Sequence, residues 1–281
     1  MVFGIQIRGF GSKNHGIPPA YLTTIIVFMS LALYNVIELL VIIRSTFKKK
    51  TGSYFWSFLV ATLGIASNVS GFFIKFFGPT SLGYLSCTLS LVGWVTMITG
   101  QSMVLWSRLH LVMRHKQRLR VILWIIIIDA ICFHGMIIPM VYGSFSSNPR
   151  KYERPYYVAE KIELIGFFLQ EVMLSSLYII EAVSLIRSER IFGNKGPATR
   201  LMKHLIFVNA LVIILDITVL ALEFANLYDV QIVYKPWAYS VKLKLEFTVL
   251  NSLVNLATAT RQMEELRSTS GSTATRRTST C

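Results

Sequence analysis

Seven stretches of the chain are almost continuously apolar or carry only isolated polar residues. Each is long enough to cross a bilayer as a helix, at ~1.5 Å per residue, and short polar or basic segments separate them. The pattern predicts an all-α, polytopic membrane protein built as a bundle of seven transmembrane helices. The expected spans are Ala20–Ile43, Tyr54–Ile74, Leu82–Ser107, Val121–Tyr142, Leu164–Ile186, Leu205–Tyr228 and Pro236–Ala259.

The last of these stretches is the least apolar, because it contains Lys242, Lys244 and Glu246. A charge at the centre of a membrane helix costs roughly 2.5–3.5 kcal/mol, whereas each apolar residue returns only about 0.3–0.6 kcal/mol. Three charges therefore cost on the order of 8–10 kcal/mol, and this segment would insert poorly by itself. We expect the surrounding bundle to supply counter-charges and hydrogen-bond partners.

The two ends of the chain differ from the membrane region. Residues 1–19 lack the continuous apolar stretch of a cleaved signal peptide and are expected to form an extracellular N-terminal arm. Residues 20–259 form the predicted seven-helix domain, and the Ser/Thr/Arg-rich residues 260–281 a disordered cytosolic tail. In that tail Ser279 follows two arginines, which makes it a candidate phosphorylation site that mass spectrometry of the tail would test.

The basic residues predict how the chain is oriented. The net charge of +14 would suggest a nucleic-acid partner in a soluble protein, but here the basic residues lie in short loops, so none is expected. The loops after the first, third and fifth spans, together with the tail, hold 18 Lys and Arg, against eight in the arm and the other loops. The positive-inside rule then places the N-terminus outside and the C-terminus in the cytosol.

Polar residues within the last two predicted spans form regular lines. On the sixth span Asn209, Asp216 and Glu223 are seven residues apart, which places them along one side of the helix. The seventh span has one line on one face and a second on nearly the opposite face. These two lines are Lys244, Thr248, Asn251 and Asn255, and Lys242 with Glu246.

Two interpretations of these lines stay open. The lines border a polar cavity that binds a ligand, an ion or a proton, or they are ion pairs and hydrogen bonds that only fix helix packing. Because seven residues connect the two spans, the helices are expected to be neighbours, with Lys244 paired to Glu223 or Asp216. The cavity candidates are Glu38, Gln101, Asp129, Glu171, Glu181, Asn209, Asp216, Glu223, Lys242, Lys244, Glu246, Asn251 and Asn255.

Other kinds of site find less support. Microbial rhodopsins pair their retinal-bearing lysine with an acid four residues earlier and with carboxylates in the third helix. Here Ala238 and Ser240 precede the two lysines, and the third span has no acid. The histidines show no HxxxH or HExxH spacing, so neither a metal nor another cofactor is expected. Arg108, where the third span ends, is interpreted as an anchor at the membrane interface.

Six segments distributed over the predicted domain carry a resemblance to a known family. They are YNVIELL (34–40), KKKTGSYFWSFLVATLGI (48–65), GQSMVLWSRLHLV (100–112), EKIELIGFFLQEV (160–172), LDITVLALEFANLY (215–228) and YSVKLKLEFTVLN (239–251). The segments resemble a fungal family of seven-transmembrane proteins of unknown function, itself similar in fold to rhodopsin-like and receptor-like proteins. The resemblance implies the seven-helix fold and assigns no activity.

The function that suits these features best is that of a receptor-like sensor, since seven spans, an outer arm, basic inner loops and a Ser/Thr-rich tail suit a protein that reports across a membrane. Its expected partners are the lipid bilayer, a small-molecule or lipid ligand, and a cytosolic signalling protein at the basic loops. A small-solute or proton-coupled transporter is the alternative, favoured by carboxylates at membrane depth. An intramembrane enzyme that uses those buried carboxylates is third. A continuous water path would favour transport, and a pocket closed at the cytosolic end would favour sensing.

The predicted orientation can be tested with glycosylation acceptor sequences. An acceptor inserted in the N-terminal arm, or beside Asn148, should be modified, because the loop charges place both positions outside. An acceptor in the tail should stay unmodified. The measurement is a gel shift that an endoglycosidase removes, and a glycosylated tail would contradict the orientation.

Overall fold

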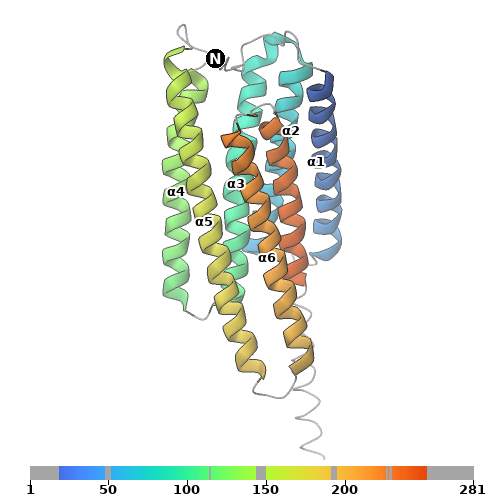
Figure 1. Cartoon of the computed structure of the whole chain (residues 1–281), viewed down its shortest axis with the longest axis vertical. Helices are drawn as coiled ribbons and strands as arrows, with labels where there is room; N and C mark the ends of the chain where they lie inside the picture. The colour runs from blue at the N-terminus through green and yellow to red at the C-terminus, as the bar shows by residue number, and fades with distance from the viewer. Residues whose placement is uncertain are drawn as a thin grey trace, which may run out of the picture.

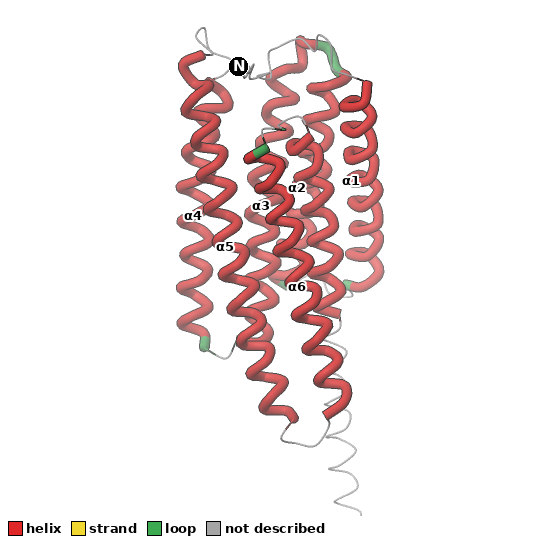
Figure 2. The backbone as a smooth tube through the Cα atoms, in the orientation of Figure 1, coloured by secondary structure: helices red, strands yellow, loops and turns green. Residues whose placement is uncertain are grey.

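The protein is a bundle of long helices (Figure 1). The computed structural model describes residues 19–47, 52–113, 115–143, 150–190, 195–225, 227 and 230–251. Within these ranges no residue lies in a strand (Figure 2), so the predicted all-α class is confirmed. The elements are α1 (Pro19–Thr46), α2 (Ser53–Phe77), the short 3-10 turn η1 (Thr80–Leu82), α3 (Gly83–Val112), α4 (Lys116–Gly143), α5 (Arg150–Arg190), α6 (Lys195–Phe224) and a further helix over residues 230–251.

Six of these helices are long and apolar enough to cross a membrane. They include Leu22–Thr46, Ser53–Phe77, Gly83–His110, Lys116–Gly143, Arg154–Ser184 and Lys203–Phe224. Their outward surfaces are apolar as well: α4 exposes Val121, Trp124, Ile128 and Ile131. Such a surface is unfavourable in water and suits the hydrocarbon of a bilayer. The chain is a multi-pass helical membrane protein, as predicted.

The helices run up and down side by side, so the bundle has two ends (Figure 1). At the end drawn uppermost, called the α2–α3 end, α2 and α4 finish and α3 and α5 begin. At the opposite end, called the α3–α4 end, α3 finishes and α4 begins. There α5 and α6 extend beyond the other helices (Figure 1). The N-terminal arm, Asn148, Asn255, Ser279 and the tail lie outside the described residues.

Among helices α1 to α6, the pair with the most extensive contact is α2 with α3, and small residues make it possible. Gly64 and Gly71 on α2 are seven residues apart, as are Gly93 and Gly100 on α3. A Cβ atom added at Gly93 would collide with the backbone nitrogen of Asn68. Because small residues let helix backbones approach, this pair forms a rigid wall of the bundle.

The helix over residues 230–251 is the most enclosed element of the bundle. Of residues 230–250 only Thr248 is exposed, although this helix is not among the six apolar spans. It begins six positions before the predicted start at Pro236, so Lys235 lies on the helix rather than in a loop. The surroundings that its charges require are therefore present.

The predicted start of the fifth span is wrong in the same direction. Helix α5 begins at Arg150 rather than at Leu164, so Glu160 and Glu163, expected in a polar loop, are helical. Its first turns bury Glu160 and expose Val158. Because the start of α5 buries charges and exposes apolar residues, it contains no continuous apolar run, and a search for such runs places the beginning of the helix too late.

The role of the small residues gives a stability prediction. Gly93→Ala should lower the free energy of unfolding by about 1–3 kcal/mol, because the added methyl group must push α2 and α3 apart. The matched control is Gly135→Ala on α4, where a Cβ meets nothing within 4 Å. That control should leave stability unchanged or raise it slightly. The measurement is unfolding of the purified protein in detergent, and equal effects of the two substitutions would contradict the packing argument.

Candidate functional site

One face of helix 230–251 carries charged side chains at three successive levels. Lys235, Tyr239, Lys242 and Glu246 follow a 4-3-4 spacing and so lie on the same side of the helix. The three charged members are 4%, 0% and 0% exposed, and each has an oppositely charged partner on another helix. We number the levels from the α2–α3 end: the first contains Lys235, the second Lys242 and the third Glu246.

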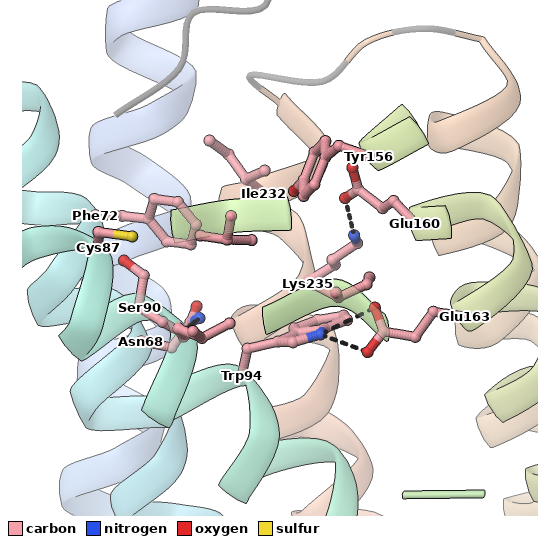
Figure 3. Close-up of a pocket in the computed structure, with 13 residues that line it drawn as sticks. Asn68, Phe72, Cys87, Ser90, Trp94, Tyr156, Glu160, Glu163, Ile232 and Lys235 are labelled. Atoms are coloured by element: carbon pink, nitrogen blue, oxygen red, sulfur yellow. Dashed lines mark hydrogen bonds and ion pairs between the residues drawn. The ribbon is translucent and has the colours of Figure 1, made fainter. Parts of the chain in front are cut away.

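The first level joins α3, α4, α5 and helix 230–251 at the α2–α3 end, and Figure 3 shows its residues Trp94, Glu160, Glu163 and Lys235. The Nζ atom of Lys235 donates to Oε1 of Glu160 at 3.1 Å and lies 4.6 Å from the centre of the Trp94 ring. Glu163 accepts a hydrogen bond of 3.1 Å from Nε1 of Trp94 and lies 3.0 Å from Nδ1 of His134. Two carboxylates of α5 thus meet an ammonium, an indole and an imidazole from three other elements.

The second level is a lysine held between two carboxylates. The Nζ atom of Lys242 donates to both carboxylate oxygens of Glu171, at 3.0 and 3.1 Å, and to Oδ1 of Asp216. The same atom lies 4.4 Å from the centre of the Tyr239 ring. One ammonium and two carboxylates leave this level with an excess negative charge unless it also holds a proton. Helices α5, α6 and 230–251 meet here.

The third level pairs two fully buried side chains near the α3–α4 end. The guanidinium of Arg108 pairs with the carboxylate of Glu246, and its carbon lies 4.3 Å from the centre of the Tyr178 ring. Arg108 was expected to be an interface anchor, but its side chain is 0% exposed. Arg108 is the last of three α3 residues spaced seven positions apart, of which Trp94 is the first. Gln101 lies between them, 1% exposed, with no hydrogen-bond partner for its amide among the described residues.

Lys244 points away from these levels, towards α1. Its Nζ atom donates to Oδ1 of Asn35 at 2.6 Å and to the carboxylate of Glu38, whose side chain is 43% exposed. The predicted pairing of Lys244 with Glu223 or Asp216 is therefore wrong. Residues two apart on a helix point about 200° apart, and the lysine two residues earlier is the one that faces α6. The prediction compared only the positions of Lys244, Glu223 and Asp216 along their helix axes. It did not take into account the direction in which Lys244 points around its own helix.

The other candidates do not join the three levels. The amide of Asn209 is buried but donates to the Leu205 carbonyl of its own helix at 2.9 Å. Asp129 and Glu181 are partly buried, and neither forms an ion pair with a described residue. Asn251 is exposed at the last described helical position. Glu223 differs from these, because it is 5% exposed and lies within electrostatic reach of the first level.

A cavity of about 60 Å³ lies within the first level (Figure 3). Helices α2, α3, α4, α5 and 230–251 surround it, and none of the side chains of the second and third levels lines it. Its volume holds roughly four water-sized groups. The lining residues are Asn68, Phe72, Cys87, Ser90, Leu91, Trp94, Ile137, Val141, Tyr156, Glu160, Glu163, Ile232 and Lys235.

Sequence reasoning missed most of the first level. One signal was available: Lys235 precedes Lys242 by seven residues, which continues the buried face of the last helix by two turns. The acids of α5 had no such signal, because their helix was not expected to extend so far. The residues missed are Trp94, His134, Glu160, Glu163 and Lys235. Among the described residues, no group of three or more His, Cys, Asp or Glu is arranged to hold a metal ion.

Comparison with known proteins places the chain only at the level of a family. Residues 17–264 match the family described as Domain of unknown function (DUF7703). This range contains every helix described above. No curated protein and no solved structure matches the chain. The match agrees with the resemblance to a family of unknown function, while the fungal origin and the likeness to rhodopsins stay predictions.

The third level gives a prediction about buried charge. Arg108→Gln and Glu246→Gln should each lower the free energy of unfolding by roughly 3–5 kcal/mol, because each leaves one charge buried without its partner. The double variant should recover much of that loss. The measurement is a double-mutant cycle by unfolding in detergent, and simple additivity would show that the two side chains are not coupled.

A matched cycle with Glu38→Gln and Lys244→Gln controls for the loss of any ion pair. Because that pair is partly exposed, its coupling should be about 1 kcal/mol or less.

Proposed function

The chain belongs to the DUF7703 family, whose description assigns no activity, and we propose that the protein is a receptor-like sensor of seven transmembrane helices. A small molecule binds in the cavity at the α2–α3 end, and the helix over residues 230–251 transmits the change to the α3–α4 end. The observation that carries the proposal is the order of polar groups along the bundle. A cavity lies at one end, and two levels of buried ion pairs separate it from the other.

The proposal takes residues 230–251 as the seventh span. Four charges keep this helix out of the apolar class, but three of them are neutralised inside the bundle and Lys244 pairs at its edge. Pairing offsets part of the cost of placing such a helix at membrane depth. With seven spans the termini lie on opposite sides, and the charges of the loops favour an outer cavity and a cytosolic α3–α4 end.

The helix over residues 230–251 is suited to couple the two ends. It lines the cavity with Ile232 and Lys235, and the same rigid helix holds Lys242 and Glu246. Any shift or rotation of this helix that follows ligand binding in the cavity displaces both lower residues from their partners. Since ion pairs between packed helices have discrete arrangements, such a displacement favours a switch between two states.

A proton-coupled transporter is the second candidate, and the second level favours it. Lys242 with Glu171 and Asp216 lies near the middle of the bundle, where ionisable groups in membrane proteins often mark proton or ion pathways. The cavity stops before this level. That arrangement suits a sensor better than a continuous path.

The proposal predicts that the first level controls the geometry of the α3–α4 end. In a variant without cysteines, spin labels at the exposed positions Arg118 on α4 and Lys203 on α6 would report the distance between these helices. Lys235→Met, which removes the first-level ammonium, should change the distribution of that distance. Lys244→Met is the matched control, because it removes a lysine of the same helix that points away from the cavity. An unchanged distribution in Lys235→Met would overturn the sensor proposal.

Flux measurements separate the two candidates. In proteoliposomes with a pH gradient the sensor should carry no protein-dependent proton flux. A flux that Glu171→Gln abolishes and Glu38→Gln leaves intact would favour the transporter, because only the first substitution alters the second level.

A further inference from the structure

The side chains around the cavity suggest what kind of molecule enters it. We propose that the cavity binds a small amine in its cationic, ammonium form. The inference rests on the proposed function, since it names the class of ligand for the same cavity. Its basis is a mostly apolar lining in which two carboxylates and two oxygen atoms without partners are set, with one ammonium, that of Lys235, already paired.

One carboxylate of the cavity lining is left without a basic partner. Glu160 is neutralised by Lys235, but Glu163 has no lysine or arginine partner among the described residues. Its contacts are the indole of Trp94 and the imidazole of His134, whose other nitrogen lies 3.2 Å from Oγ1 of Thr99. Both ring nitrogens of His134 therefore have partners within the protein. Glu163, without a lysine or arginine partner among the described residues, presents a carboxylate that a cation can pair with.

Residues next to the lining set carry both signs. Glu223 adds a carboxylate within electrostatic reach of Glu160 and Lys235, and Lys161 supplies one further ammonium. Lys75 supplies another, which lies 5.8 Å from the centre of the Phe72 ring and within electrostatic reach of Cys87. None of these three residues lines the cavity, so Glu163 stays the lining carboxylate without a lysine or arginine partner among the described residues. An anionic guest would have to compete with Glu160 for Lys235 while facing Glu163.

Asn68 and Ser90 lie on the opposite wall of the cavity (Figure 3). The amide nitrogen of Asn68 donates to the Ser90 carbonyl at 2.9 Å. The amide oxygen of Asn68 and the hydroxyl of Ser90 have no partner among the described residues, and the two side chains are 2% and 3% exposed. Buried polar atoms without partners are costly. An ammonium group offers several N–H donors and no acceptor, so it complements this wall.

The cavity wall already binds one ammonium, that of Lys235. The Lys235 side chain is held by a carboxylate on one side and lies 4.6 Å from the centre of the Trp94 ring. A carboxylate combined with an aromatic face is a favourable environment for cations. A guest ammonium beside Glu163 would find the same two kinds of group. The volume of about 60 Å³ admits an ammonium with one or two carbon atoms.

The test uses the full-length protein in detergent, with methylammonium and ethylammonium chloride as probes. Both should raise the melting temperature in a saturable way and shift tryptophan emission through Trp94. Methanol matches methylammonium in size without the charge, sodium acetate supplies an anion, and sodium chloride controls for ionic strength; none of these should saturate. Tetramethylammonium, which is too large and has no N–H donor, should not bind.

Glu163→Gln should weaken methylammonium binding by about tenfold to a hundredfold, since one charge-assisted hydrogen bond is lost. The glutamine keeps the side-chain size and an oxygen that can accept from Trp94. Glu38→Gln removes a carboxylate on α1 outside the cavity lining and should leave binding unchanged. Should Glu163→Gln fail to fold, Trp94→Phe with calorimetric detection tests the same wall, and it should weaken binding as well.

Saturable methylammonium binding that Glu163→Gln weakens and Glu38→Gln does not would support the inference. Equal effects of methanol or sodium chloride would show that the cavity holds water only, and preferential acetate binding would show an anion site; either result overturns it. The sensor proposal fails separately. If methylammonium binds while the label distance in Lys235→Met stays unchanged, the amine site stands and the sensor does not.

Discussion

The structure depends on the neutralisation of charge inside a membrane bundle. Helix 230–251 buries Lys235, Lys242 and Glu246, and an unpaired charge buried inside the bundle costs several kcal/mol. Partners for these three side chains come from α3, α5 and α6, so only an arrangement that brings all three helices around this one avoids the cost. Apolar side chains facing lipid tolerate many rotations of a helix, whereas a buried ion pair tolerates few. The ion pairs therefore determine how the helices are turned.

A second constraint acts on the other side of the cavity. The glycines of α2 and α3 bring these two helices so close that side chains at their contact have little freedom to move. Asn68 and Ser90 lie in this contact, and both line the cavity. One wall is thus rigid through backbone packing, and the facing wall consists of side chains held by ion pairs. A cavity between a fixed wall and a charge-dependent wall is suited to respond to a charged guest.

The same helix connects this cavity with the middle of the bundle, where Lys242 lies between two carboxylates. These side chains belong to α5, α6 and helix 230–251, and each of these helices runs along the bundle between its two ends (Figure 1). A change in protonation or position at the second level would therefore shift helices that reach both ends. The same arrangement of helices therefore suits both sensing and proton coupling. Sensing is favoured because the cavity does not reach the second level.

The sequence by itself determined the helical membrane class, the approximate bounds of most spans and the need of the last one for counter-charges. These follow from local properties, since apolar length and charge can be counted along the chain. It did not reveal that α5 starts at Arg150, because a helix that buries Glu160 and Glu163 has no apolar run there. Nor did it identify the partners of Lys242 and Lys244. Only the tertiary structure decided those, because a helix with apolar residues on every side has no preferred rotation until its charges meet particular neighbours.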